Sequence, residues 1–289
     1  MNPLEIPYLL RIIFAFLSKE DRSNIYRTCK IFRENYRWVD PREAIIRCLS
    51  KNNHRLANEI CDCVGQYIQC DAILFDLACT NGNIKVVNRC IDSNIDPSYL
   101  YNRAIRMASC NGHLLVVNRL LQDPRVDPTG LDNFAIIYSS SYGKLSVVER
   151  LLQDPRVDPS YSQNQAIRMA SYYGHLSVVE RLLQDPRVDP SDKNNWAICV
   201  ASRGGYLSVV ERLLEDPRVD PSVNNNEALN NATVVHRYLV VQRLLKDPRV
   251  NHLADSKKLG GFKQTKKTEN NYDDFDSYCI QLVIKWRSP

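Results

Sequence analysis

The sequence predicts an all-α protein built as a stack of short helix pairs. The first observation is an internal repeat: Asp-Pro-Arg-Val-Asp-Pro begins at residues 123, 154, 185 and 216, each step being 31 residues, and Asp-Pro-Arg-Val returns at 247. The second is a glycine in the same register, at residues 112, 143, 174 and 205. The third is the helical spacing of the apolar residues between these markers. A fixed period of this size is typical of repeat proteins, in which each unit packs on the next.

The first helix of each unit is expected to begin at an asparagine and to end at the repeated glycine. Residues 164–173 represent this helix, with Asn164 as the N-cap and Gly174 in the left-handed conformation that ends a helix. The equivalent asparagines are Asn133, Asn195 and Asn226.

The second helix is expected over residues 176–183, and Asp185-Pro186 follows it because the residue before a proline disfavours the helical conformation. Its apolar face is expected to hold Leu176, Val179, Leu182 and Leu183. Helices of about eight to ten residues are marginal alone in water. We therefore expect the pairs to bury their apolar faces against one another, with atypical end units. His236 in place of the glycine marks such an end.

The run Gly174-His175-Leu-Ser-Val-Val-Glu-Arg-Leu-Leu183 closely resembles the Gly-His-x-x-Val-Val-x-x-Leu-Leu of ankyrin repeats. The resemblance covers about residues 71–252 and implies an ankyrin-repeat solenoid that binds other proteins on its concave face. Asn-x-Ala-Ile replaces the family's Thr-Pro-Leu-His, and the unit is two residues shorter than the common 33. Because the shortfall falls in the turn, we expect reduced hairpin tips. The near-identity of the copies is similar to the repeat proteins of large DNA viruses of amoebae and their hosts.

The chain is expected to divide into an N-terminal module over residues 1–40, repeats over 41–252 and a tail over 253–289. The expected repeats are 41–70 as a degenerate copy, then 71–101, 102–132, 133–163, 164–194, 195–225 and a terminal copy at 226–252. Lysines around Gly260-Gly261 indicate a solvated linker, with a nuclear-localisation signal as the alternative. The last run, 278–286, is apolar enough to cap the final repeat.

Residues 4–38 carry a pattern of their own, from Ile6-Pro7 through a run of apolar residues to Cys29-Lys30-Ile31-Phe32-Arg33. The pattern resembles the F-box, a three-helix module that docks on a Skp-family adaptor and so joins a cullin ubiquitin ligase. Carried over by motif, the adaptor-binding residues are Ile6, Pro7, Leu10, Ile13, Phe14 and Leu17, with Cys29, Lys30 and Phe32 in the last helix. Arg22 and Phe32 depart from the family's leucine and tryptophan. The alternative is a hydrophobic cap on the first repeat.

The candidate target-binding residues vary between copies while their neighbours do not. One slot follows the repeated asparagine, and two more precede the glycine. Aromatic and arginine side chains are typical binding anchors, and in ankyrin stacks these slots lie at or near the concave face. The residues are Phe134, Tyr142, Gln165, Tyr172, Tyr173, Trp196 and Arg203. The alternative is drift at unconstrained surface sites.

Other repeated residues are expected to be structural. His113 and His175 follow the glycine, where the family's histidines hydrogen-bond the neighbouring loop. A charge ladder on the second helices is interpreted as a solvated face; it holds Glu149, Glu180 and Glu211 beside Arg150, Arg181 and Arg212.

Composition argues against several classes of function. The 289 residues carry a net charge of +5, too small and scattered to indicate nucleic-acid binding. Ten cysteines without a C-x-x-C predict no zinc site, and free thiols fit a reducing compartment. No stretch approaches the roughly 20 apolar residues of a membrane helix. No phosphate loop, nucleophile elbow or pair of acids indicates an enzyme.

We therefore predict a monomeric intracellular protein, cytoplasmic or nuclear (in the host cell if viral), without cofactor or metal. It is expected to be an adaptor, the substrate-recruiting subunit of a Skp–cullin–F-box ubiquitin ligase. Such an adaptor works by tethering an unknown target protein near the charged ubiquitin carrier, which raises its effective concentration. The alternative is an ankyrin scaffold or sequestering binder without a ligase.

Overall fold

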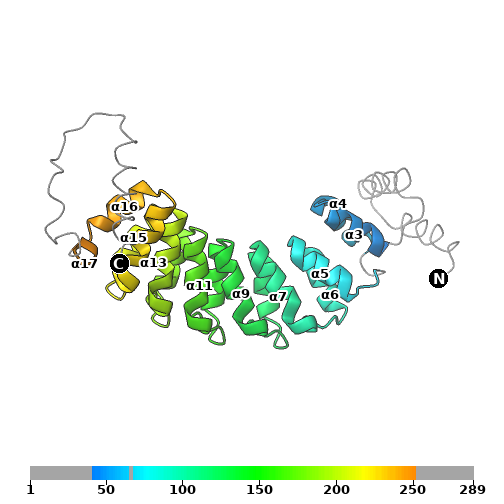
Figure 1. Ribbon diagram of the computed structural model, residues 1–289. Helices are drawn as coiled ribbons and strands as arrows, with labels where there is room; N and C mark the ends of the chain where they lie inside the picture. The colour runs from blue at the N-terminus through cyan, green and yellow to red at the C-terminus, as the bar shows by residue number, and fades with distance from the viewer. Residues whose placement is uncertain (1–40, 65–67, 252–289) are drawn as a thin grey trace, which may run out of the picture. The chain divides into compact units, whose positions relative to one another are not determined.

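The computed structural model describes residues 41–64 and 68–251, and these ranges are helical without a strand (Figure 1). The predicted all-α class is confirmed for them. The described residues form two compact units, one of residues 41–64, 68–108 and 115–126 and the other of residues 109–114 and 127–251. The expected F-box-like module and tail lie outside the described residues.

The first unit is built from two helix pairs, of which α3 packs on α4 and α5 on α6. The bounds of its helices are α3 Pro41–Ser50, α4 His54–Val64, α5 Ala72–Asn81 and α6 Ile84–Asp92. The pairs also contact each other, α3 against α5 and α4 against α6. Ion pairs between Arg42 and Asp71, and between Lys85 and Asp62 at 2.7 Å, join them. Helices α7 Tyr99–Asn111 and α8 Leu114–Leu121 follow.

The second unit continues the alternation of a first and a second helix. Its helices are α9 Gly130–Ser141, α10 Leu145–Leu152, α11 Tyr161–Tyr172, α12 Leu176–Leu183, α13 Asp192–Gly204, α14 Leu207–Leu214, α15 Val223–Val234, α16 Tyr238–Leu245 and α17 Pro248–Asn251. First helices contact first helices, from α9 to α15, and second helices contact second helices, from α10 to α16 (Figure 1). Each pair thus covers the apolar side of the pair before it.

The core repeats in the 31-residue register. Ile136, Ile167 and Ile198 of the first helices are at most 1% exposed. Helices α10, α12 and α14 bury two valines and two leucines each, which in α12 are Val178, Val179, Leu182 and Leu183. The expected face was wrong at one position, because Leu176 is half-buried while Val178 is fully buried. With helices on two sides, an eight-residue helix buries more than one stripe.

A left-handed turn interrupts each first helix from α7 to α15 near its N-terminal end. In α11 the turn is formed by Ser162, Gln163 and Asn164, with φ of 53°, 58° and 56°. Three such residues in a row cost about 1–2 kcal/mol each. Buried Arg168 offsets part of that cost, because its Nε and Nη2 donate to the carbonyls of Gln163 and Ser162, at 2.8 and 2.9 Å. Reduced hairpin tips were expected between successive repeats, and the described repeats have this three-residue left-handed turn there.

The repeated asparagine joins neighbouring units and does not cap its own helix. Asn164 Oδ1 accepts from the backbone N–H of Asp189, 25 residues later, at 2.8 Å. Asn133 and Asn195 make the same bond to Asp158 and Asp220. The N-cap prediction was wrong in this respect, since the side chain points to the following unit and leaves the capping position.

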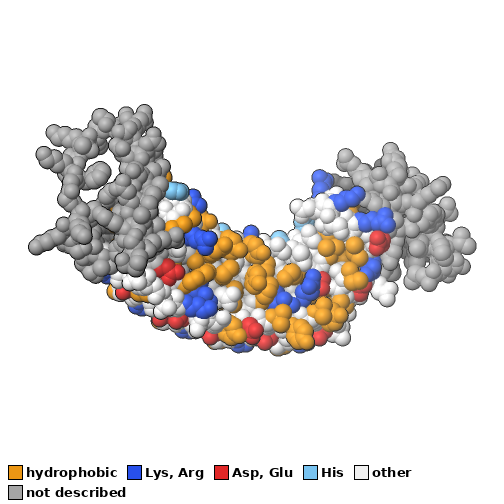
Figure 2. All heavy atoms as spheres, in the orientation of Figure 1, with side chains coloured by type: hydrophobic (Ala, Val, Ile, Leu, Met, Phe, Trp, Pro, Cys, Tyr) orange, Lys and Arg blue, Asp and Glu red, His pale blue; other side chains and the backbone are white. Residues whose placement is uncertain are grey.

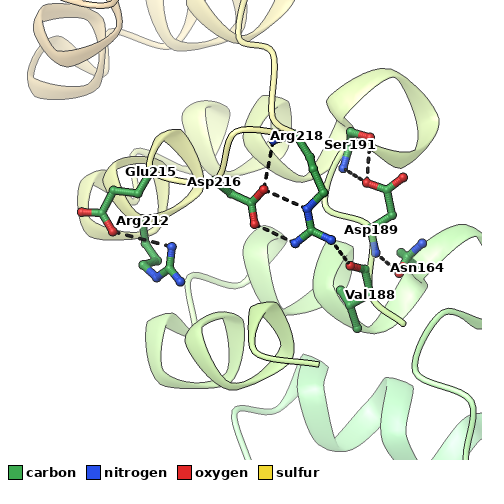
Figure 3. A network of polar contacts seen from close by, with 8 residues as sticks. All are labelled: Asn164, Val188, Asp189, Ser191, Arg212, Glu215, Asp216 and Arg218. Atoms are coloured by element: carbon green, nitrogen blue, oxygen red, sulfur yellow. Dashed lines mark hydrogen bonds and ion pairs between the residues drawn. The ribbon is translucent and has the colours of Figure 1, made fainter. Parts of the chain in front are cut away.

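The Asp-Pro-Arg-Val motif forms a second joint between units (Figure 3). Arg218 Nε and Nη2 donate to the carboxylate of Asp216 at 2.9 and 2.7 Å, and Nη1 donates to the carbonyl of Val188 in the preceding unit at 2.7 Å. Arg187 and Arg249 repeat the arrangement. The adjacent guanidinium holds the pKa of Asp216 below its usual range. Each aspartate therefore orients an arginine that binds a backbone carbonyl of the preceding unit.

The glycine after each first helix forms a third joint. Gly143 and Gly174 have φ of +65° and +75°. A Cβ on Gly143 would lie 2.7 Å from Nδ1 of His175, and one on Gly174 would lie 2.4 Å from the ring of Tyr206. His175 Nε2 is 2.8 Å from the carbonyl oxygen of Ser141, which can only accept, so Nε2 carries the proton. His175 therefore has the expected structural role, and glycine is needed both for its conformation and for close packing.

Candidate functional site

Aromatic side chains gather on the exposed side of the first helices of the second unit, and Figure 2 shows hydrophobic side chains over α9 and α11. We call this surface the aromatic face. Its members are Phe134, Tyr138, Tyr142, Tyr172, Tyr173 and Trp196. The four tyrosines are between 39% and 56% exposed, a large fraction for rings of this size.

One cluster lies along α9. The rings of Phe134 and Tyr138 stack with centroids 3.8 Å apart and planes inclined by 15°. Tyr138 and Tyr142 follow at 6.4 Å. Tyr138 was missing from the residues predicted from the sequence. Its signal was the spacing 134, 138, 142, because residues four apart share one side of a helix.

A second cluster is shared between α11 and α13. The rings of Tyr172 and Trp196 are nearly parallel, at 7°, with centroids 6.3 Å apart. Tyr173 packs edge-on against Tyr172 at 4.9 Å. The guanidinium carbon of Arg168 lies 5.2 Å from the Trp196 ring centroid, within cation–π range. The indole is thus fixed by a ring and a cation before any ligand arrives.

The charged group nearest the second cluster is the guanidinium of Arg168, which is partly removed from water. Burial lowers the pKa of Arg168, and Asp192 opposes that shift. Such a guanidinium still carries its charge at neutral pH, because an arginine starts from a pKa above 12.

The predicted target-binding residues divide by exposure. Tyr142, Tyr172, Tyr173 and Arg203 are exposed, whereas Phe134, Gln165 and Trp196 are half-buried. The structure joins Phe134 to the α9 cluster and Trp196 to the second, and it places Gln165 on the intervening helix without a ring contact. The predicted single stripe is therefore two aromatic clusters. The adaptor-binding residues predicted in 1–40 lie outside the described residues.

Charge on this side of the second unit is positive. The segments 134–145, 165–176 and 196–207 contain no aspartate or glutamate. In the described part of the chain, Lys144 and Arg203 make no ion pair. Asp132 and Asp192 lie in the first turn of α9 and of α13, while Lys144 and Arg203 lie at the glycine end of these helices. Aromatic rings and unpaired cations thus occur together.

Within residues 41–64 and 68–251, no group of three or more His, Cys, Asp and Glu side chains lies close enough to hold a metal ion. No helix in these ranges is both long and apolar enough to cross a membrane. The described cysteines are free thiols; they are Cys48, Cys61, Cys70, Cys79, Cys90, Cys110 and Cys199.

A family model agrees with the repeat geometry over part of the chain. Residues 105–194 match the family model for ankyrin repeats (3 copies). Among solved structures, the chain is similar to an ankyrin repeat family protein from Legionella pneumophila, with 17% identity, a TM-score of 0.41, and coverage of 92% of this chain and 93% of that one. Curated protein sequences give no match. The repeats over residues 105–194 are ankyrin repeats, and the described residues as a whole form an all-α stack of helix pairs.

Proposed function

We propose that this chain binds a target protein through the aromatic face of its second unit. Ankyrin repeats indicate a protein–protein interaction scaffold. The observation that carries the more specific proposal is the pair of stacked clusters, Phe134–Tyr138 on α9 and Tyr172–Trp196 between α11 and α13. Rings already held in place lose little conformational entropy on binding, and aromatic residues are enriched among interface hot spots.

A finer proposal concerns what the bound target is for. We propose that the chain recruits the target to a Skp–cullin ubiquitin ligase. Support comes from the F-box-like pattern of residues 4–38 and from the absence of any need for catalysis in a tethering subunit. A plain ankyrin binder without the ligase is the competing function.

The target-binding proposal is tested with the full-length chain as bait. A target captured by cross-linking and then purified should bind Trp196→Ala more weakly by about 2 kcal/mol or more, because hot-spot truncations cost that much. Tyr142→Ala is a second variant whose ring is 56% exposed, so its loss leaves the packing intact. Glu180→Ala is the matched control on the exposed side of α12.

The outcome depends on affinity per folded molecule, so melting curves accompany each titration. Loss of affinity in Trp196→Ala and Tyr142→Ala, but not in Glu180→Ala, supports the aromatic face. Equal affinity for all three variants would place the binding surface elsewhere.

The ligase proposal has a separate test. A purified Skp-family adaptor should bind the full-length chain, and Pro7→Ala with Leu10→Asp should weaken that binding by several kcal/mol, because a charge replaces an interface anchor. If the unmodified chain fails to bind the adaptor while it still binds the target, the chain is an ankyrin binder without a ligase.

A further inference from the structure

The aromatic face has an unusual charge balance. Its three helix segments, 134–145, 165–176 and 196–207, hold 36 residues without a carboxylate, in a chain where 33 of 289 residues are acidic. At that frequency about four would be expected. Lys144 and Arg203 stay without an ion-pair partner among the described residues. A ligand for this face therefore needs negative charge as well as apolar rings.

The chain itself contains a segment of that chemistry. Residues 269–278 read Glu-Asn-Asn-Tyr-Asp-Asp-Phe-Asp-Ser-Tyr, with four carboxylates and three aromatic rings. The segment begins 18 residues after Asn251, the end of α17, and no other ten residues of the chain combine rings and acids in this way. It lies outside the described residues.

We propose that residues 269–278 bind the aromatic face of the same chain and cover it until a target displaces them. The carboxylates of Asp273, Asp274 and Asp276 pair with Lys144 and Arg203, and the intervening rings lie against the clusters of α9 and α11–α13. The segment is then an autoinhibitory ligand. This inference rests on the proposed function only for its biological meaning, since the contact itself needs no target.

The linking chain is long enough for the contact. Eighteen residues span at most about 60 Å when extended. The linker starts at α17, which packs on α16, and α16 packs on α15; three more steps between neighbouring first helices lead from α15 to α9. At about 8–10 Å each, these five steps span at most about 50 Å. The segment can therefore reach every member of the aromatic face.

Tethering makes even a weak contact effective. A short flexible linker gives an effective concentration in the millimolar range. If the free segment bound with a dissociation constant of about 100 μM, a local concentration of about 1 mM would keep about ten molecules closed for each one open. Five lysines in residues 257–267 are the competing partners for the same carboxylates.

The experiment uses a fluorescently labelled synthetic peptide of residues 268–278, titrated into the full-length chain and followed by anisotropy. The variant Asp273→Asn, Asp274→Asn, Asp276→Asn removes three of the four negative charges of the chain's own segment and so weakens its hold on the face. We expect the peptide to bind this variant about tenfold more tightly than it binds the unmodified chain, as the ratio above implies. High salt should weaken the binding.

A second variant locates the contact. Lys144→Glu with Arg203→Glu, added to the asparagine variant, should abolish peptide binding. Arg203→Gln alone is the milder change to use if the double charge reversal impairs folding, and it should reduce peptide binding severalfold. The proposal is overturned if the peptide binds the unmodified and asparagine chains equally. It is also overturned if the Lys144 and Arg203 changes leave peptide binding unaffected, which is the result expected if the acids pair with the lysines of residues 257–267. Target binding that depends on Trp196 would survive either result, so failure of this inference and failure of the proposed function are distinguishable.

Discussion

Replacing Arg218 with alanine tests the joint between neighbouring repeats. The side chain donates two hydrogen bonds to Asp216 and one to the carbonyl of Val188 in the preceding unit. The Asp216 side chain is 9% exposed and that of Arg218 is 39% exposed (Figure 3). The change therefore leaves a nearly buried carboxylate and a backbone carbonyl short of donors.

The magnitude follows from those partners. A buried polar group left unpaired costs about 1–3 kcal/mol. Asp216 keeps one bond, from the backbone N–H of residue 218 at 3.0 Å, and solvent screens the exposed part of the guanidinium, so the lower half of that range applies to each group. For the two groups together, we expect Arg218→Ala to lower the free energy of unfolding by about 2–4 kcal/mol.

The assay is urea unfolding at pH 7 followed by circular dichroism. Arg212→Ala is the matched control, because it removes the same charge from the same repeat but breaks only a 3.6 Å pair with Glu215, whose side chain is 68% exposed. Its cost should stay below about 1 kcal/mol. If Arg218→Ala costs no more than Arg212→Ala, the joint does not stabilise the stack and the reasoning fails.

Three further predictions follow from buried groups. Ser171→Ala should leave the free energy of unfolding unchanged or raise it by up to about 1 kcal/mol in the same assay, because the residue is 0% exposed and its hydroxyl has no partner in the described structure. A loss above about 1 kcal/mol would reveal a hidden hydrogen bond. The four aspartates of the Asp-Pro-Arg-Val motif in the second unit have pKa values lowered by their arginines, so their stabilisation is complete above the unfolded pKa near 3.8 and is lost as pH falls through the folded values. The urea midpoint should thus be flat from pH 7 to about 5 and fall below about pH 4, and a midpoint that rises on acidification would contradict the sign. A hydrogen bond with Cys90 lowers the pKa of Cys70 to about 6, so iodoacetamide at neutral pH should modify Cys70 first among the described thiols. Mass spectrometry of digests would show the order of labelling. Burial raises the pKa of Cys199 to about 12, and preferential labelling of Cys199 would refute this prediction.

Much of the site was visible in the sequence. The slot after the asparagine pointed to Phe134 and Trp196, and the slots before the glycine pointed to four more side chains. The sequence could not show that Trp196 is half-buried between Tyr172 and Arg168, since those residues lie one repeat away. Tyr138 was missed because it lies in none of the variable slots, although its spacing of four residues from Phe134 and Tyr142 places it on their side of α9.

The sequence by itself determined the period, the helix pairs, the glycines and the apolar register, because each depends on residues a few positions apart. Only the tertiary structure decided the partners of the repeated polar residues. Asn164 contacts Asp189 over 25 residues, Arg218 contacts Val188 over 30, and His175 contacts Ser141 over 34. Contacts at these separations depend on how one unit is rotated and shifted on the next. A side chain that looks like a helix cap or a solvated charge in one repeat therefore becomes a joint when a second repeat is placed beside it.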